Sequence, residues 1–264
     1  MNEIDLQRRI DRAAELIIGS EYVTALVGAG MSVESGIPPF RGPGGIWTKY
    51  GEPEMDGYRK MLQDPEGYWL ERNSDEGPMA EFRNTFEQAR PNPGHLAMAE
   101  MEEMGHLRCI ITQNVDNLHG EAGSRNVAEI HGNSTKLRCV GCNSRWPAAE
   151  YEITDYPPLC DDCGGIIKYD TVMFGEPIPF DVMVKCEQES RKSDCMMLVG
   201  TTAEVYPAAG FPNMIKAAGG ALIEINPYET VISARCDLTL RGPSGDILPR
   251  LVEGIKGLRP TGSA

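Results

Sequence analysis

Two pairs of cysteines place the tightest restriction on how this chain of 264 residues can fold. Cys139 and Cys142 form one C-x-x-C pair, and Cys160 and Cys163 form a second pair after the intervening residues 143–159. Two such pairs can close a tetrahedral site of four thiolates around one zinc ion. Because cysteine fills all four positions, none is left for water, and the zinc is expected to be structural. The alternative, four free thiols, would leave a loop-rich stretch with little core to hold it.

Short apolar runs alternate with helix-compatible segments through most of the remaining sequence. We expect strands at 22–27, 107–111, 127–130, 195–199, 221–225 and 238–240. An amphipathic helix is expected over 5–18, ended by Gly19, and another over 94–105. Strands that alternate with helices are typical of an α/β fold. We therefore predict a Rossmann-like parallel sheet with helices on both faces.

The predicted sheet domain is interrupted by two insertions. Between residues 36 and 92, dense prolines and glycines are followed by short polar helical patterns, which indicates an inserted helical segment with a ligand-binding loop. The cysteine-bearing stretch 133–170 is the second insertion, a zinc-binding module. The sheet domain is then built from 1–35, 93–132 and 171–264, and the insertions form a small zinc-ribbon and helical domain.

The formal net charge of -14 argues against direct nucleic-acid binding, because a phosphate backbone would repel such a surface. An acidic surface favours lysine-rich polypeptides, although it also serves solubility alone. No apolar run is long enough to predict a membrane span. The polar, acidic start of the chain lacks the features of a secretory signal, and eight cysteines without a leader are a poor disulfide framework. These features predict a cytoplasmic protein.

A glycine turn follows the first expected strand. Gly28-Ala29-Gly30-Met31-Ser32 would let the backbone approach a ligand and offer helix N–H groups to a pyrophosphate. Alone this motif is weak, because Val33 stands where a third glycine is usual. The next run, Ser35-Gly36-Ile37-Pro38-Pro39-Phe40-Arg41-Gly42, combines rigid turns with one aromatic ring and one cation. That combination suits a loop that covers a nucleotide, with an ordinary glycine–proline loop as the plainer alternative.

Polar residues follow two other expected strands. Thr112-Gln113-Asn114-Val115-Asp116-Asn117-Leu118-His119 comes at a strand end, where open α/β sheets bind ligands, although such residues also cap helices. His131, in Glu129-Ile130-His131-Gly132, ends another strand and is a candidate general base, because histidine titrates near neutrality. A lone histidine is more often structural, yet the strand-end position favours function. His95 and His106 flank a helix, and they are weaker candidates for a catalytic role.

Three C-terminal strands also end in small or hydrogen-bonding residues. These ends are Val199-Gly200-Thr201-Thr202, Glu224-Ile225-Asn226 and Arg241-Gly242-Pro243-Ser244-Gly245. Any one of them could be an ordinary turn from a strand into a helix. Three in succession indicate the rim of a nucleotide pocket.

In this order, the motifs resemble those of the sirtuins, which are NAD-dependent protein-lysine deacylases. The match covers about residues 10–255 and includes the motifs above, the four cysteines and Phe174-Gly175-Glu176. The resemblance implies that the acyl-lysine carbonyl oxygen attacks the ribose C1′ of NAD as nicotinamide leaves. It also implies that His131 then acts as general base on a ribose hydroxyl, giving deacylated lysine and O-acyl-ADP-ribose.

The resemblance implies a role for each motif. Catalysis falls to His131, Asn114 and Asp116. NAD contacts fall to Gly28, Ala29, Gly30, Ser32, Gly36, Ile37, Pro38, Phe40, Arg41, Trp47, Gln113, Asn114, Val115, Asp116, Gly200, Thr201, Thr202, Asn226 and Ser244. The acyl-lysine protein or peptide would contact Arg72, Val172, Phe174, Gly175 and Glu176. The four cysteines, Cys139, Cys142, Cys160 and Cys163, would hold one structural zinc ion.

Some positions depart from the usual sirtuin residues: Thr202 replaces a serine, Asn117 a common glycine and Tyr169 a common proline. The run from Gly42 to Trp47 is similar to a subgroup, with bacterial and archaeal members, that often removes succinyl and related acidic groups. That subgroup reads the acyl carboxylate with a Tyr-x-x-Arg pair. When the two sequences are aligned by position, Arg72 corresponds to the tyrosine of that pair and Asp75 to its arginine. We therefore expect weak desuccinylation, although the guanidinium of Arg72 could bind the acyl carboxylate in a different way.

Two other functions remain open at this point. The same activation of NAD could end in ADP-ribosyl transfer or in simple NAD hydrolysis, but the joint presence of Asn114, Asp116 and His131 favours deacylation. The chain could also be a zinc-ribbon interaction module on an inactive nucleotide-binding scaffold. That alternative requires a damaged catalytic set, and the set is complete.

Overall fold

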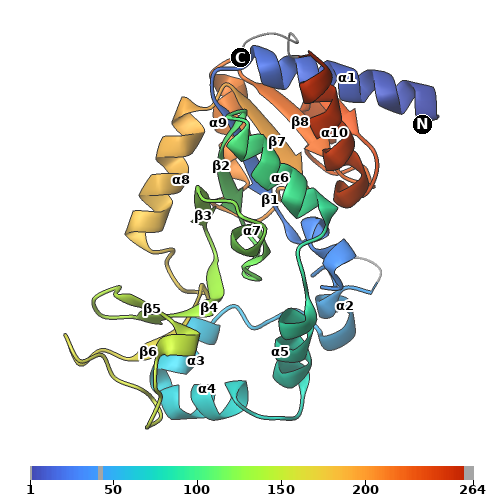
Figure 1. Cartoon of the computed structure of the whole chain (residues 1–264). Coiled ribbons are helices and arrows are strands. Elements are labelled where there is room, and N and C mark those ends of the chain that lie inside the picture. Colours follow the sequence, from blue (N-terminus) through green and yellow to red (C-terminus); the bar gives the residue numbers. More distant parts are fainter. Residues whose placement is uncertain (1, 41–43, 259–264) are drawn as a thin grey trace.

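The computed structural model describes residues 2–40 and 44–258, and its centre is a six-stranded parallel sheet (Figure 1). The strands are β1 (Val23–Val27), β2 (Leu107–Thr112), β3 (Val127–Glu129), β7 (Cys195–Val199), β8 (Ala221–Ile225) and β9 (Leu238–Leu240). They lie in the order β3-β2-β1-β7-β8-β9. The chain runs outward from β1 to β3 and then continues on the other side from β7 to β9. The order therefore reverses between β1 and β7, and the predicted parallel α/β sheet is confirmed.

Helices cover both faces of this sheet. They are α1 (Glu3–Gly19), α6 (Pro93–Glu103) and α10 (Ser244–Leu258) on one face, and α8 (Phe180–Lys192) and α9 (Gly210–Ala217) on the other. Side chains alternate along a strand, so Val23 and Ala25 of β1 face the first group and Leu26 faces the second. The strands are buried on both sides, and this explains their continuous apolar runs.

The opening helix shows how local sequence sets these elements. Asn2 caps α1 by accepting a hydrogen bond from Asp5 N at 2.8 Å. Leu6, Ile10 and Ile17 lie on the buried face of the helix, so the helix predicted over 5–18 is confirmed. Within the described ranges, no helix is both long and apolar enough to cross a bilayer.

The two inserted segments come together at the other end of the molecule (Figure 1). Their elements are α2 (Ile46–Tyr50), α3 (Gly57–Gln63), α4 (Pro65–Arg72), α5 (Pro78–Gln88), β4 (Gly132–Cys139), β5 (Arg145–Pro147) and β6 (Ile167–Thr171). β4 pairs antiparallel with β5 and β6. Trp69 of α4 is fully buried against this small sheet, and its Nε1 donates to Ile167 O at 3.0 Å. We call residues 44–92 and 132–171 the small lobe.

The stretch expected to be loop-rich thus contains an antiparallel sheet. The sequence does not reveal it, because β5 has three residues and β4 mixes Lys136 and Arg138 with its apolar residues. The remaining elements are short. They are η1 (Ala29–Met31), η2 (Val33–Ser35), α7 (Leu118–Glu121), η3 (Ala148–Glu150) and η4 (Ser233–Arg235).

Candidate nucleotide-binding and catalytic site

Three glycines bring the carboxyl ends of β1 and β7 into contact. Gly28 N donates to Val199 O at 3.0 Å, and Gly30 N donates to Gly200 O at 2.8 Å. A Cβ atom at Gly28 would lie 2.8 Å from Gly200 O, and one at Gly30 would lie 2.7 Å from Gly200 Cα. Side chains here would push the two strands apart at the point where the strand order reverses, which is where open α/β sheets bind ligands. Packing of the chain against itself therefore requires these glycines, independently of any ligand.

A buried polar cluster lies beside this turn. Asp116 accepts hydrogen bonds from Ser32 Oγ at 2.6 Å and from Leu118 N at 3.0 Å. Asn114 Nδ2 donates to Gly28 O and to Ser32 Oγ, both at 3.1 Å. Burial raises the pKa of Asp116, and the hydrogen bond from Ser32 opposes that shift. The cluster joins the end of β1 to the end of β2 and fixes the directions of its polar groups, as ligand sites require.

The ends of β2, β7 and β8 are joined by a second set of hydrogen bonds. Gln113 Nε2 donates to Thr201 Oγ1 at 2.9 Å, and Asn226 Nδ2 donates to Thr201 O at 3.3 Å. Thr201 and Asn226 are buried, whereas Thr202 is exposed. The structure therefore gathers the residues expected from three separate motifs along one edge of the sheet.

Two residues that the sequence analysis did not select hold this edge in place. Glu34 accepts a hydrogen bond from Gly245 N at 2.6 Å at the start of α10, and its carboxylate lies 3.5 Å from the buried Ser244 hydroxyl. Asn92 caps α6, and its Nδ2 donates to Met31 O at 2.8 Å. The proline that follows Asn92 is a typical helix-start signal and could have identified it. A single glutamate in a loop carries no such signal.

His131 lies between the polar edge and the small lobe. Its Nδ1 is 3.1 Å from Gln113 O. Because a carbonyl oxygen only accepts, Nδ1 carries the proton and Nε2 keeps its lone pair. Burial lowers the pKa of His131, and the hydrogen bond to Gln113 O opposes that shift. The backbone oxygen of His131 accepts from Val172 N at 2.8 Å, so this residue joins the sheet edge to residues 172–176.

The loop expected to cover a nucleotide is partly within the described residues. Gly36 has a φ of 89°, a conformation that favours glycine. Ile37 is buried, and Pro38 is partly exposed. Arg41, which was predicted to contact NAD, lies outside the described residues.

An aromatic contact connects this loop to the predicted substrate-binding residues. The ring centroid of Trp47 lies 5.4 Å from that of Phe40 and 5.9 Å from that of Phe174. Phe40 belongs to the loop after β1, and Phe174 follows β6. Trp47, predicted from the resemblance as an NAD contact, therefore touches residues from both predicted sites.

The other predicted substrate residues fall into two groups. Val172 and Gly175 belong to the loop beside His131, but the carboxylate of Glu176 turns inward, where its side chain is 2% exposed and pairs with Lys168 Nζ at 3.1 Å. The guanidinium of Arg72 lies 4.4 Å from the centroid of the Tyr169 ring, within the small lobe. The side chain of Asp75 is 99% exposed.

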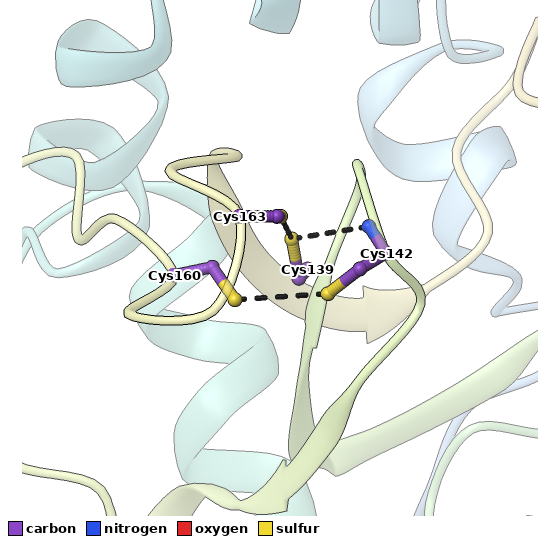
Figure 2. Close-up of side chains that lie close together, drawn as sticks. All are labelled: Cys139, Cys142, Cys160 and Cys163. Carbon is purple, nitrogen blue, oxygen red and sulfur yellow. Dashed lines mark hydrogen bonds between the residues drawn. The ribbon is translucent and has the colours of Figure 1, made fainter.

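The four paired cysteines meet as their spacing predicts. Figure 2 shows their thiols pointing toward one another from the end of β4 and the loops that follow β4 and precede β6, and all four Sγ atoms lie within 4.8 Å of one another. The Sγ atoms of Cys139 and Cys163 are 3.4 Å apart, and those of Cys142 and Cys160 are 3.6 Å apart. Zinc–sulfur bonds of about 2.3 Å in a tetrahedron give sulfur separations of about 3.8 Å. The set therefore fits one structural zinc ion.

Comparisons with known proteins agree with this geometry. The Sir2 family model matches residues 28–207. NAD-dependent protein deacylase 2 of Pyrobaculum aerophilum is 41% identical over 244 residues, which cover 92% of this chain and 94% of that protein. NAD-dependent protein deacylase of Pyrococcus abyssi is 38% identical, with 94% and 99% covered.

Solved structures give the same result. The ADP-ribose complex of a Sir2 homologue has a TM-score of 0.83 and 37% identity over the full length of both chains. A Sir2 complex with a p53 peptide and NAD+ has a TM-score of 0.75 and 32% identity, with 94% of this chain and 98% of that chain covered. The family model matches more than half of the sequence, and both relatives align over nearly their whole length. This chain belongs to the Sir2 family.

Proposed function

We propose that this chain is an NAD-dependent protein-lysine deacylase that transfers the acyl group to ADP-ribose. The observation that carries the proposal is the position of His131, whose Nδ1 faces Gln113 O while its backbone oxygen bonds Val172 N. This position supports a role for His131 as a base between the predicted nucleotide edge and the loop predicted to bind acyl-lysine, and burial of the ring favours its neutral form. The names of the two archaeal relatives, both NAD-dependent protein deacylases, support the same activity.

Each side chain at the predicted nucleotide edge of the sheet has a separate role in the proposed reaction. When bound, NAD would supply the ribose C1′ that receives the acyl oxygen of acyl-lysine, with nicotinamide as the leaving group. His131 Nε2 would then accept the proton of a ribose hydroxyl, so that the hydroxyl oxygen can attack the acyl carbon. Lysine would leave as the free amine, and a water molecule would supply the carbonyl oxygen of the resulting ester. Asn114 and Asp116, both 7% exposed and held by Ser32, orient the ribose and the nicotinamide amide. The N–H groups after Gly28 serve the pyrophosphate.

For the acyl group, we propose a preference for uncharged chains such as acetyl over succinyl. Arg72 stacks on Tyr169 inside the small lobe, and Asp75 is exposed and lies 3.3 Å from Arg83 Nη2. An aspartate at this position repels a carboxylate tail rather than binding it. A panel of acetyl, propionyl, succinyl and long-chain acyl peptides tests this preference, and faster turnover of the succinyl peptide would contradict it.

A direct test of the activity mixes the protein with NAD and an acetyl-lysine peptide, and follows nicotinamide and O-acetyl-ADP-ribose. We expect both products only when the peptide is present. Nicotinamide release at the same rate with and without the peptide would instead support NAD hydrolysis. ADP-ribose attached to the peptide would support ADP-ribosyl transfer. His131→Ala should abolish turnover while NAD binding persists, and turnover that survives this change would refute the role of the histidine.

We also propose that the protein works in the cytoplasm. All eight cysteines are free thiols, and four of them lie close enough together to hold one metal ion. Thiolates that hold zinc must stay reduced, as they do in the cytosol. Loss of the bound metal under cytosolic glutathione conditions would contradict this proposal.

A further inference from the structure

Glu176 was expected to line the peptide cleft, but its carboxylate points into the small lobe. The side chain is 2% exposed. It accepts hydrogen bonds from Arg138 Nη2 and, at 2.9 Å, from Met173 N, and it pairs with Lys168 Nζ at 3.1 Å. The carboxylate therefore cannot contact a substrate lying on the outer side of the loop. We call residues 172–176 the substrate loop.

The partners of Glu176 belong to a buried network of matched charges. Arg138 also pairs with Asp170 at 2.7 Å, and the side chains of Arg138, Asp170 and Lys168 are 7%, 4% and 0% exposed. Two buried cations thus face two buried carboxylates. Burial lowers the pKa of Lys168 to about 8, and Glu176 opposes that shift. Removing one carboxylate from such a network leaves a buried cation without its partner.

The rest of the substrate loop is held by backbone contacts from two sides. Val172 N donates to His131 O at 2.8 Å, and Phe174 O accepts from Tyr58 N at 3.1 Å. Gly175 has a φ of 82°, and a Cβ atom there would lie 2.9 Å from Met55 O. The Phe174 ring also contacts Trp47. Glu176 adds a side-chain attachment that ties the loop to Arg138 of β4 and Lys168 of β6. The position of the loop relative to His131 therefore depends in part on the ion network.

We propose that Glu176 is a positioning residue for the acyl-lysine substrate, which acts through Arg138 and Lys168 without touching the substrate. The inference rests on the proposed deacylase function. A substrate strand that pairs with the loop backbone needs that backbone at one fixed position. Changes in the network should therefore weaken the peptide complex and leave the NAD edge, which is formed by β1, β2, β7 and β8, unchanged.

The first test is Glu176→Gln, which keeps the size of the side chain and an acceptor for Met173 N but removes the charge. We expect the peptide KM to rise roughly tenfold, because part of the binding free energy is then used to order the loop when the peptide binds. The NAD KM, and kcat at saturating peptide, should stay within about twofold of the wild-type values. Glu187→Gln is the matched control, because Glu187 lies on α8 in an exposed pair with Arg191. It should leave all three constants unchanged.

The second test restores the charge balance with Glu176→Gln combined with Lys168→Met. In this double variant, Arg138 and Asp170 remain as a matched pair. The peptide KM should return to within about threefold of wild type. This variant keeps the proposal testable if Glu176→Gln alone fails to fold. Polarisation of a fluorescent acetyl-lysine peptide, measured without turnover, should follow the same order of affinities.

The outcomes separate this inference from the function on which it rests. Wild-type protein without peptide-dependent nicotinamide release would overturn the deacylase proposal, and this inference with it. Normal wild-type turnover together with an unchanged peptide KM in Glu176→Gln would overturn the inference alone. A folded double variant whose peptide KM stays more than about threefold above the wild-type value would also overturn it, because matched charge would then not set the loop position.

Discussion

The sheet domain and the small lobe are held together by different kinds of contact. The larger apolar cluster of the sheet domain contains 25 of the described residues, so the loss of one contact leaves most of it intact. The cluster of the small lobe contains five, and two of these are the thiols Cys139 and Cys160. A region with so small an apolar core needs additional cross-links, such as a structural metal, to stay folded. Here these are the four thiolates and the buried ion network, so single substitutions should affect the lobe far more than the sheet.

The largest effect is expected when the thiolate cluster is broken. Cys160→Ser removes one of four zinc ligands, and structural zinc sites contribute on the order of 10 kcal/mol to folding. The small lobe should lose its zinc and unfold at a lower temperature than the sheet domain, which gives two thermal transitions. Metal content by mass spectrometry and calorimetry check this result.

Cys236→Ser makes the same chemical change in the sheet domain, where the thiol is partly buried and lies outside the cluster. It should keep one zinc ion per chain and a single transition. An unchanged melting temperature and metal content in Cys160→Ser would show that the lobe does not depend on the metal.

The next largest effect is expected in the ion network. Asp170 accepts from Arg138 at 2.7 Å and from Arg145 at 2.8 Å, with its side chain 4% exposed. Asp170→Asn removes the charge between two cations, and breaking a buried pair in this way costs roughly 3 kcal/mol of unfolding free energy. Urea unfolding measures the difference.

Asp181→Asn is the control, because Asp181 also pairs with Arg145 but its side chain is 54% exposed. Exposed pairs contribute under about 1 kcal/mol, so this variant should differ little from wild type. Equal losses in the two variants would mean that burial of the network adds nothing to the stability of the lobe.

The same contrast explains what could be predicted from the sequence. The strands and helices of the sheet domain follow from continuous apolar runs and from caps, and the strand-end motifs that predict a nucleotide site lie along one edge of the sheet. The cysteine spacing located the metal cluster for a similar reason, because it is a local pattern. The strand-end position also made His131 a candidate general base, but the tautomer of its ring depends on the carbonyl of Gln113, which no side-chain pattern reports.

The small lobe was harder to predict because its contacts join distant segments. Trp69 bonds Ile167 across the two insertions, and nothing near Trp69 in the sequence identifies that partner. Glu176 was assigned to the peptide cleft from its motif, yet its direction is set by Arg138 and Lys168, which belong to other strands. The direction of a side chain such as Glu176 depends on charged partners that are far away in the sequence and come together only when the chain folds.

The sheet domain contains a pair of buried histidines that should lower its stability in acid. The rings of His95 and His119 are buried with centroids 4.9 Å apart, and neither nitrogen of His119 has a hydrogen-bond partner among the described residues. Burial lowers the pKa of His95 to about 4 and that of His119 to about 3. Unfolded imidazoles titrate near 6.5, so stability that is complete above 6.5 is lost as the pH falls toward 4 and 3.

This loss can be assigned to one ring with a substitution. Between pH 7 and pH 5, each imidazole should cost about 2 kcal/mol of unfolding free energy. His119→Phe removes one titrating ring and keeps an aromatic of similar shape, so its loss over this interval should be smaller by about that amount. Urea unfolding at the two pH values gives the comparison. Equal losses in variant and wild type would mean that His119 is not held neutral by burial.

The smallest effect is expected in the pH dependence of catalysis, where the two regions meet at His131. Burial lowers the pKa of His131 from its usual 6.5, and a general base must be neutral to accept a proton. The value of kcat/KM should therefore fall on the acid side with a midpoint below 6.5, and it should be level from about one pH unit above the midpoint up to pH 8. The measurement needs a peptide without groups that titrate in this range. A midpoint above 6.5 would mean that burial does not lower the pKa of the His131 ring in the working enzyme.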